Sequence, residues 1–360
     1  MLARMARPGL FRRTLYAGLS LVLFFGVLEI AAHVAEPRLY TPERTLPLPQ
    51  PGRDADFLAK AAKVRDTLGG VPMIPDDATR WGLPPDRIVM SGSVPCRINS
   101  FGLRGPDLGP REPEEDRLLT LGDSSIFGDG VPESNVFSTV AARALQSKWH
   151  HKVTPVIGGV PGHDSSQSLA RLREKGAAVA PTWVVVGNMW SDVYKDHGFA
   201  RTNTVVEKVR SPLTTFATYR VARLLLAPFL RQQKVGWIGS MKEDVGGQDP
   251  EGHARVLLQD YITNLRAIAD EAKKLGARPA FLALPAPIDL DPAGPPEDVL
   301  EYREAMRQVA ASVGAPFVDG PAWLKSHGGT IGHFADQVHP NVHGHKLIGE
   351  AVADALGAAE

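Results

Sequence analysis

The sequence contains a single cysteine, Cys96, and carries no excess of charge of either sign. One thiol excludes an internal disulfide framework and any metal site that requires several cysteines. Because 40 basic residues balance 40 acidic ones, no net charge attracts nucleic acid or anionic surfaces. Internal repeats and low-complexity tracts are also absent. With 43% apolar residues in a chain of 360, the protein can bury one large core or two modest ones.

A long apolar run lies at the N-terminus, where four arginines precede the stretch from Leu15 to Ala32. Its length is close to the roughly 20 apolar residues that a membrane span requires. We therefore expect a transmembrane helix over about residues 14–35, with a cytoplasmic N-terminus and an exported body. Glu29 interrupts the run late in the span, near the far interface, where the cost of a carboxylate is small. The arginines are Arg4, Arg7, Arg12 and Arg13.

The same run has two alternative interpretations, a cleaved signal peptide and a buried core helix. Cleavage after Ala32 or Ala35 would place Ile30 or His33 three residues before the cut, where signal peptidase prefers small residues. A core helix is not expected at the extreme terminus beside four arginines. The sequence therefore favours an uncleaved anchor.

The rest of the chain divides by composition. Residues 1–36 form the anchor, and 37–94 form a proline- and glycine-rich tether with an accessory segment of loops and a hairpin. Residues 95–360 form the main domain, which carries an insertion at 192–252. Within the insertion, Leu213–Leu230 is expected to be helical. It either docks on the main domain or acts as a lid or membrane-facing element.

Apolar runs of strand length alternate with amphipathic helical segments from residue 117 onward. Strands are expected at 118–121, 153–157, 183–186, 279–284 and 316–318. Helices are expected at 134–146, 166–175, 254–275, 298–313 and 343–356. This alternation predicts a mainly parallel, five-stranded α/β sheet covered by helices on both sides.

Three residues have the chemistry of an activated nucleophile. Ser124 follows the first strand and should open a helix, whose free N–H groups and dipole favour a developing oxyanion. Asp336 precedes His339 by three residues in a loop, where a carboxylate can orient the imidazole while its other nitrogen faces a serine. Ser124, Asp336 and His339 are therefore our candidate catalytic residues.

Two further turns offer oxyanion donors, and one histidine cluster raises a metal alternative. Gly162 follows the second strand and can present its N–H, while Asn188 or Ser191 follows the third and offers a side chain. His339 and His343 have the spacing of a helical zinc site, but Pro340 opposes a helix through both. We therefore expect neither a metal nor a cofactor. The other histidines of the cluster are His333 and His345.

Taken in order, these segments resemble the SGNH/GDSL hydrolase family. The similarity lies in Gly122-Asp-Ser-Ser125, in the Gly162 segment and in Asp336-Gln-Val-His339. The approach through Arg97-Ile-Asn-Ser-Phe-Gly-Leu-Arg104 resembles an exported bacterial branch of that family. The resemblance covers residues 95–357 and implies a flavodoxin-like three-layer α/β/α sandwich that hydrolyses esters through an acyl-serine.

The resemblance also implies a role for each matching residue. Ser124 would be the nucleophile, His339 the base and Asp336 its orienting partner, and Ser124 and Gly162 would donate N–H groups to the oxyanion. The third family block normally reads Gly-x-Asn-Asp, with the asparagine as a further donor. Here Ser191 stands where that asparagine is expected, and Asn188 lies three residues earlier. Loss of one such donor typically costs about 10²–10³ in turnover, so the departure concerns the strength of catalysis rather than its type.

The expected function is an exported serine esterase that hydrolyses acyl esters, such as acetyl esters, of carbohydrate or lipid. One alternative is an O-acyltransferase acting on an exported polysaccharide, since a sugar hydroxyl can replace water. Others are a catalytically weak carbohydrate-binding member of the fold, and a lipase with Leu213–Leu230 as its lid. The expected partners are the substrate and, through the N-terminal helix, the membrane, but not nucleic acid. The expected location is the cell membrane, with a periplasmic or extracellular catalytic domain, or secretion after signal cleavage.

Overall fold

The structure is a computed structural model in which the chain forms two compact units. One unit combines residues 1–42 with 203–240, and the other combines 43–202 with 241–360. The residues that the structure describes are 10–40, 45–47, 71, 73–76, 78–196, 216–219, 221–222 and 253–359.

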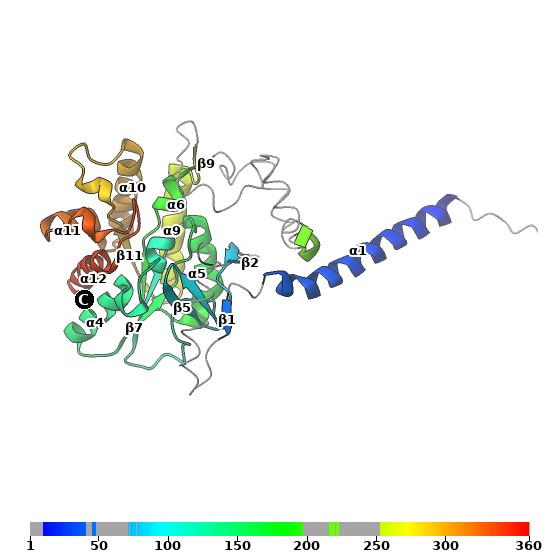
Figure 1. Ribbon diagram of the computed structural model, residues 1–360, viewed down its shortest axis with the longest axis horizontal. Coiled ribbons are helices and arrows are strands. Elements are labelled where there is room, and N and C mark those ends of the chain that lie inside the picture. Colours follow the sequence, from blue (N-terminus) through cyan, green and yellow to red (C-terminus); the bar gives the residue numbers. More distant parts are fainter. Residues whose placement is uncertain are drawn as a thin grey trace, which may run out of the picture. The chain divides into compact units, whose positions relative to one another are not determined.

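The second unit is built on a five-stranded sheet in which all neighbouring strands are parallel (Figure 1). Its spatial order is β12-β11-β8-β6-β7, which is the flavodoxin-like order when the strands are renumbered along the chain. This confirms the predicted fold class. The strands are β6 (Asp116–Leu121), β7 (Val153–Ile157), β8 (Trp183–Val186), β11 (Arg278–Ala283) and β12 (Phe317–Asp319).

Helices cover both faces of this sheet because successive strand residues point to opposite sides. Leu119 and Val184 belong to the apolar cluster shared with α5, α9 and α10. Leu118 and Val185 belong to the cluster shared with α4 and α12. The long helices are α4 (Phe137–Trp149), α5 (Ser165–Val179), α9 (Leu258–Lys274), α10 (Glu297–Val313) and α12 (Val342–Gly357). The short ones are α3 (Ser124–Phe127), α6 (Trp190–Val193) and α11 (Gly320–Ser326).

The helix expected over 254–275 begins later, at Leu258. The residues before it, β10 (His253–Ala254), pair antiparallel with β9 (Lys195–Asp196) instead. This two-stranded ribbon connects the two ends of the insertion on the second unit.

The accessory segment before residue 95 contains more strand structure than loops and one hairpin. The strands β2 (Ile74–Asp76) and β3 (Arg80–Gly82) form one hairpin, and β4 (Arg87–Ser91) and β5 (Val94–Ile98) form another. The short β1 (Thr45–Pro47) pairs with β4. Apolar side chains from residues 81–98 pack with Phe127 of α3 and Val160 of the loop after β7. The members from these residues are Trp81, Leu83, Val89, Cys96 and Ile98.

Cys96 lies inside this small core and is 1% exposed. Burial raises the pKa of its thiol to about 11, so the thiolate is not formed at neutral pH. The single cysteine is therefore a packing residue.

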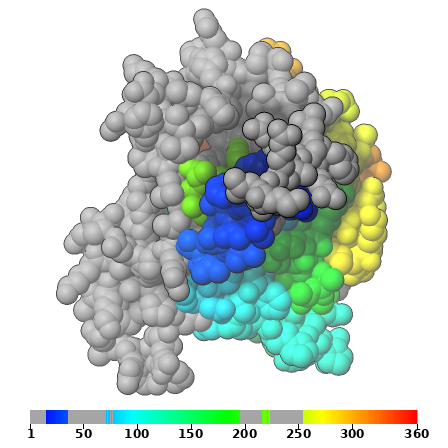
Figure 2. Space-filling model, turned by 90° about the vertical axis from the view of Figure 1, so that its right-hand side faces the viewer, coloured from blue at the N-terminus to red at the C-terminus, as the bar shows by residue number. Residues whose placement is uncertain are grey.

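The first unit contains α1 (Leu10–Tyr40), which is apolar from Leu15 to Ala35 with a mean hydropathy of 2.0. By length and composition, α1 is the one helix among the described residues that could span a membrane. Most of its large apolar side chains from Leu15 to Val34 are exposed, unlike those of a core helix, and Figure 2 shows part of this surface. Most of the helix expected at Leu213–Leu230 lies outside the described residues, although 217–219 and 221–222 are helical.

Glu29 of α1 binds the start of that second helix. Its carboxylate accepts hydrogen bonds from the N–H groups of Ala217 (2.5 Å) and Thr218 (3.0 Å) and from the Thr218 hydroxyl (2.6 Å). These are the groups that an N-cap normally satisfies, so Glu29 serves as a cap supplied by another helix.

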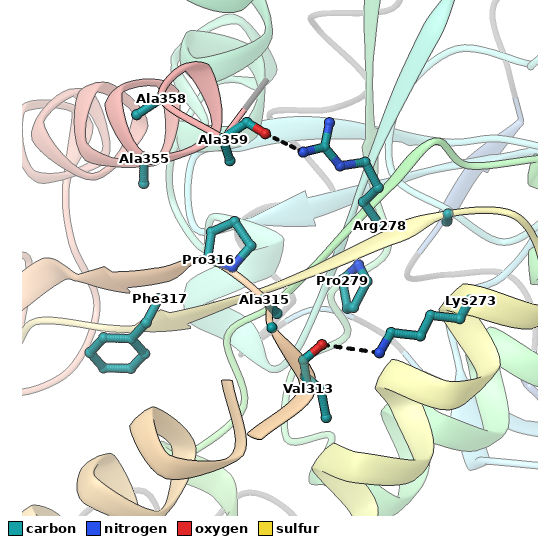
Figure 3. A pocket seen from close by; sticks show the side chains of 12 residues that line it. Lys273, Arg278, Pro279, Val313, Ala315, Pro316, Phe317, Ala355, Ala358 and Ala359 are labelled. Carbon is teal, nitrogen blue, oxygen red and sulfur yellow. Dashed lines mark hydrogen bonds between the residues drawn. The ribbon is translucent and has the colours of Figure 1, made fainter. Parts of the chain in front are cut away.

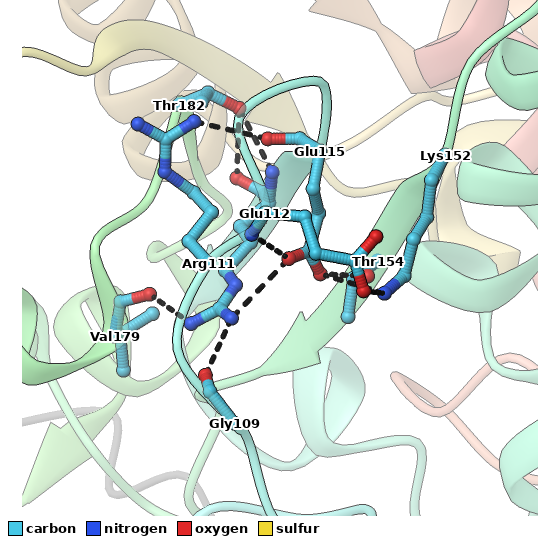
Figure 4. Close-up of polar contacts among 9 residues, drawn as sticks. Gly109, Arg111, Glu112, Glu115, Lys152, Thr154, Val179 and Thr182 are labelled. Carbon is cyan, nitrogen blue, oxygen red and sulfur yellow. Dashed lines mark hydrogen bonds and ion pairs between the residues drawn. The ribbon is translucent and has the colours of Figure 1, made fainter.

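A buried polar network surrounds Glu115, just before the first strand of the sheet, β6 (Figure 4). The Glu115 carboxylate accepts hydrogen bonds from the Glu112 N–H (3.0 Å), from Arg117 (3.3 Å) and from the Thr154 hydroxyl. Arg117 also donates to carbonyl oxygens of Gly109 and Val179. The network thereby ties the segment before β6 to the amino ends of β6 and β7.

Glu115 should make the fold sensitive to acid. Burial opposes its ionisation, but the hydrogen bonds from Thr154, Glu112 and Arg117 outweigh burial and lower its pKa to about 2. Its ordinary pKa is about 4.3, so the stability that the carboxylate contributes is complete above that value and disappears as the pH falls towards 2. We predict that Glu115→Gln lowers the melting temperature at pH 7 and flattens its decline between pH 5 and 2. The exposed Glu112→Gln is the matched control, and equal acid profiles for Glu115→Gln and the wild type would contradict the prediction.

Candidate active site

The loop that carries Ser124 is shaped by the close approach of α3 to the strand ends. Gly122 follows β6 with a φ of +154°, and a Cβ there would lie 2.4 Å from Ile126 of α3. A Cβ on Gly187, after β8, would also lie 2.4 Å from Ile126, and one on Gly159, after β7, would lie 2.4 Å from the Phe127 nitrogen. Side chains at these three positions would push α3 off the sheet.

Asp123 caps α3 and links it to the third motif. Its side chain accepts from the Ser125 N–H at 3.0 Å, which leaves the Ser124 N–H without a partner among the described residues. The second carboxylate oxygen accepts from the N–H and the hydroxyl of Ser191, both at 3.3 Å. Burial raises the pKa of Asp123.

The structure brings Ser124, His339 and Asp336 together. The Ser124 Oγ and His339 Nε2 are 2.7 Å apart, and the His339 Nδ1 and Asp336 Oδ2 are 2.6 Å apart. In the tautomer that fits this arrangement, Nδ1–H donates to Asp336 and Nε2 accepts the serine proton. Ser125 also donates its hydroxyl to the Val338 carbonyl at 3.2 Å, so the two loops are joined beside the triad.

The electrostatics of His339 and Asp336 support a general base. Burial disfavours the charged imidazole, but the hydrogen bond and charge of Asp336 outweigh it and raise the pKa of His339. Burial likewise opposes ionisation of Asp336. The hydrogen bonds from the His339 side chain and from the N–H groups of Val338 and His339 nevertheless hold its pKa below the usual range. An ionised Asp336 can therefore stabilise the imidazolium that forms when His339 takes a proton.

Gly162 lies in the loop after β7 with a φ of +77°, a conformation that favours glycine. This loop is joined to the nucleophile turn by a hydrogen bond from the Val160 N–H to the Gly122 carbonyl (3.0 Å). Among the described residues, the Gly162 N–H has no hydrogen-bond acceptor. It therefore has the free donor that an oxyanion hole requires.

The two candidates for a third donor occupy different environments. The Asn188 side chain is fully buried, and its amide donates to the His163 carbonyl at 3.3 Å. Ser191 is partly exposed and lies against Asp123, next to the nucleophile. Of the two, Ser191 has the side chain that contacts Asp123, the residue before Ser124.

The sequence pattern did not assign a role to Arg104, which anchors the far end of α3. Its guanidinium is buried and donates to the carbonyls of Phe127 (2.7 Å), Gly128 (2.7 Å) and Val131 (2.5 Å). Its charge also lies 4.8 Å from the centre of the Phe127 ring. Arg104 therefore satisfies carbonyls at the C-terminal end of the helix that Ser124 opens. The sequence feature that could have indicated this role is the position of Arg104 at the end of the motif that starts at Arg97.

Other candidate sites are weaker. Among the described residues, no three His, Cys, Asp or Glu side chains are arranged to hold a metal ion. A hollow of about 660 Å³ lies at the amino ends of β11 and β12 (Figure 3), whereas Ser124 follows the carboxyl end of β6. In that hollow Lys273 and Arg278 donate to main-chain carbonyls, and no nucleophile or carboxylate belongs to the described lining.

Several solved structures are similar to this chain. The crystal structure of TesA is 19% identical over 67% of this chain and 98% of its own, with a TM-score of 0.43. That of Axe2, an acetylxylan esterase from Geobacillus stearothermophilus, is 19% identical over 67% and 94%, with a TM-score of 0.44. That of LAE5, an α/β hydrolase enzyme from the metagenome of Lake Arreo, Spain, is 16% identical over 68% and 96%, with a TM-score of 0.44.

Sequence comparisons give one positive result. No curated protein sequence matches this chain. Residues 239–347, which include Asp336 and His339, match the model of the GDSL-like lipase/acylhydrolase family. The match supports an ester hydrolase, while the exported branch stays a prediction. The resemblance inferred from the motifs is therefore confirmed by a match to the GDSL-like lipase/acylhydrolase family over this part of the chain.

Proposed function

We propose that this protein is a serine esterase in which Ser124 forms an acyl-enzyme. The observation that carries the proposal is the continuous chain of short contacts from Ser124 through His339 to Asp336. The family match adds an ester as the bond that is broken. The free N–H groups of Ser124 and Gly162 supply the complementary donors.

In the proposed reaction, Ser124 Oγ attacks the ester carbonyl while His339 Nε2 accepts the hydroxyl proton. The carbonyl oxygen becomes an oxyanion that receives hydrogen bonds from the N–H groups of Ser124 and Gly162. When the tetrahedral intermediate collapses, the alcohol leaves with the proton from His339. Water then attacks the acyl-serine by the same steps and releases the acid.

We assign the third oxyanion donor to the Ser191 hydroxyl. It lies beside the nucleophile turn, whereas the Asn188 amide is buried and already donates to the His163 carbonyl. Because Ser191 now donates to Asp123 over a long 3.3 Å contact, rotation towards an oxyanion would break only a weak hydrogen bond.

The proposed substrates are acyl esters, such as acetyl esters, of carbohydrate or lipid. The same acyl-serine can be captured by a sugar hydroxyl, which would make the protein an O-acyltransferase acting on an exported polysaccharide. Product analysis with and without a sugar acceptor separates the two reactions.

We predict that Ser124→Ala lowers hydrolysis of short p-nitrophenyl esters by roughly 10³-fold or more, because no nucleophile remains. The purified variant should keep the wild-type melting temperature. A fluorophosphonate should label the wild type at Ser124, and Ser125→Ala, which keeps the nucleophile, should still be labelled. Undiminished hydrolysis by Ser124→Ala, or an adduct at another residue, would refute the assignment.

The pH profile should report the state of His339. Only the neutral imidazole can act as a base, and Asp336 raises its pKa, so activity should rise with pH through a value above the ordinary 6.5 or so. We predict that Asp336→Asn shifts this acid limb to lower pH and lowers the plateau of kcat by roughly 10³–10⁴. The measurement is kcat and kcat/KM between pH 5 and 9. An unmoved limb would exclude Asp336 as the partner of the base.

We also propose that α1 anchors the protein in the membrane, with the catalytic domain outside the cytoplasm. The support is its exposed apolar side chains, together with the three hydrogen bonds that satisfy Glu29. Satisfied in this way, the carboxylate is less costly to place near the membrane interface. The alternative location is secretion after cleavage of the same segment.

An alkaline wash of isolated membranes tests the anchor. We predict that the full-length chain stays in the pellet at its full mass, because the apolar surface of α1 remains in the bilayer at high pH. A variant that lacks residues 1–36 is the control and should become soluble. Release of the full chain, or recovery of a shortened soluble form, would contradict the anchor.

A further inference from the structure

The peptide group between Pro161 and Gly162 is held by an indole from outside the three catalytic motifs. The Trp81 Nε1–H donates to the Pro161 carbonyl at 3.1 Å. That carbonyl belongs to the same peptide group as the Gly162 N–H, whose donor is free among the described residues. The carbonyl side of the peptide is therefore fixed by Trp81, and the N–H on the opposite side is left free to donate.

Building on the proposed function, we propose that Trp81 and Arg255 are positioning residues that clamp the oxyanion loop. Trp81 lies on β3 in the accessory hairpin, and Arg255 follows β10 at the end of the insertion. The Arg255 guanidinium donates to the Gly162 carbonyl at 2.8 Å. The two carbonyls that flank the Gly162 α-carbon are thus each held by a side chain from a segment outside the motifs.

The Trp81 ring also limits the backbone itself. A Cβ on Gly162 would lie 3.5 Å from Cζ2 of Trp81, so the ring lies against the α-carbon of this left-handed glycine. A glycine has more backbone freedom than any other residue type. At Gly162 this freedom is restricted by the Trp81 ring and by the hydrogen bonds of Trp81 and Arg255 to the two flanking carbonyls. The N–H direction is therefore set before the substrate binds.

Trp81 is itself fixed by residues next to the loop. Its carbonyl accepts from the His163 Nε2–H at 2.8 Å and from the Thr79 hydroxyl at 2.9 Å. Burial lowers the pKa of His163 to about 3, so its imidazole is a neutral donor rather than a second base. Gln167 at the start of α5 donates to the Thr79 carbonyl at 2.6 Å. These contacts tie the hairpin to the loop as one rigid element.

The hydrogen bond from Trp81 also affects the strength of the opposite donor. A donor on a peptide carbonyl polarises the group, and the N–H of that peptide then donates roughly 10–30% more strongly. Because an oxyanion exists only in the transition state and the intermediate, this gain lowers the barrier without tightening substrate binding. The expected signature is a change in kcat at constant KM.

The test compares Trp81→Phe, which keeps the ring but removes the N–H, with Trp323→Phe in the full-length protein. The Trp323 Nε1 has no hydrogen-bond partner among the described residues, and Trp323 lies on α11, away from the loop. With p-nitrophenyl acetate, Trp81→Phe should lose roughly 10-fold in kcat with KM and the acid limb of the pH profile unchanged. Its fluorophosphonate labelling of Ser124 should slow in parallel. Trp323→Phe should match the wild type.

Arg255→Met is the second variant, and it decides the result if Trp81→Phe does not fold. It should lower kcat several-fold without moving the acid limb, since His339 is untouched. Wild-type kcat in the folded Trp81→Phe and Arg255→Met proteins, or a rise in KM alone, would overturn the clamp. Failure of the proposed function looks different, because Ser124→Ala would then remain active and wild-type Ser124 would take no fluorophosphonate.

Discussion

The active site depends on how closely the short helix α3 approaches the ends of β6, β7 and β8. Ile126 lies in a space that exists only because Gly122 and Gly187 have no side chain. Gly159 makes the matching space for the backbone at Phe127. The position of Ser124 is therefore set by backbone packing at the carboxyl edge of the sheet. The triad contacts then use a hydroxyl whose place is already determined.

The site also separates groups that should carry charge from groups that should not. Asp336 is half exposed and receives three hydrogen bonds from its own loop, so it stays ionised next to His339. Asp192, behind the third motif, is fully buried, and its pKa is raised well above the usual range by burial and by Asp164. Burial therefore disfavours a charge on Asp192, in contrast to Asp336.

The sequence predicted the elements and motifs that depend on local residue patterns. It did not predict contacts between segments that are far apart in the chain. The apolar runs at 118–121 and 183–186 identified core strands, and two short motifs predicted Ser124 and His339, whose side chains lie 2.7 Å apart. The sequence predicts loops and a single hairpin in the segment that contains Trp81. Two hairpins form there, and the one with Trp81 is hard to predict because its strands are three residues long and only partly apolar. No local pattern could show that its indole reaches the Pro161 carbonyl, 80 residues later in the chain.

The same distinction explains how the site is organised. The motif loops supply the reacting atoms, but a loop with a left-handed glycine does not by itself hold an N–H group in one direction. Ordering one residue costs roughly 1–2 kcal/mol, and a loop that orders only during the reaction adds this cost to the barrier. Contacts from Trp81 and Arg255 move that cost into folding. In the mechanism proposed above, the hairpin that carries Trp81 and the end of the ribbon β9–β10 therefore hold the oxyanion loop from outside its motifs.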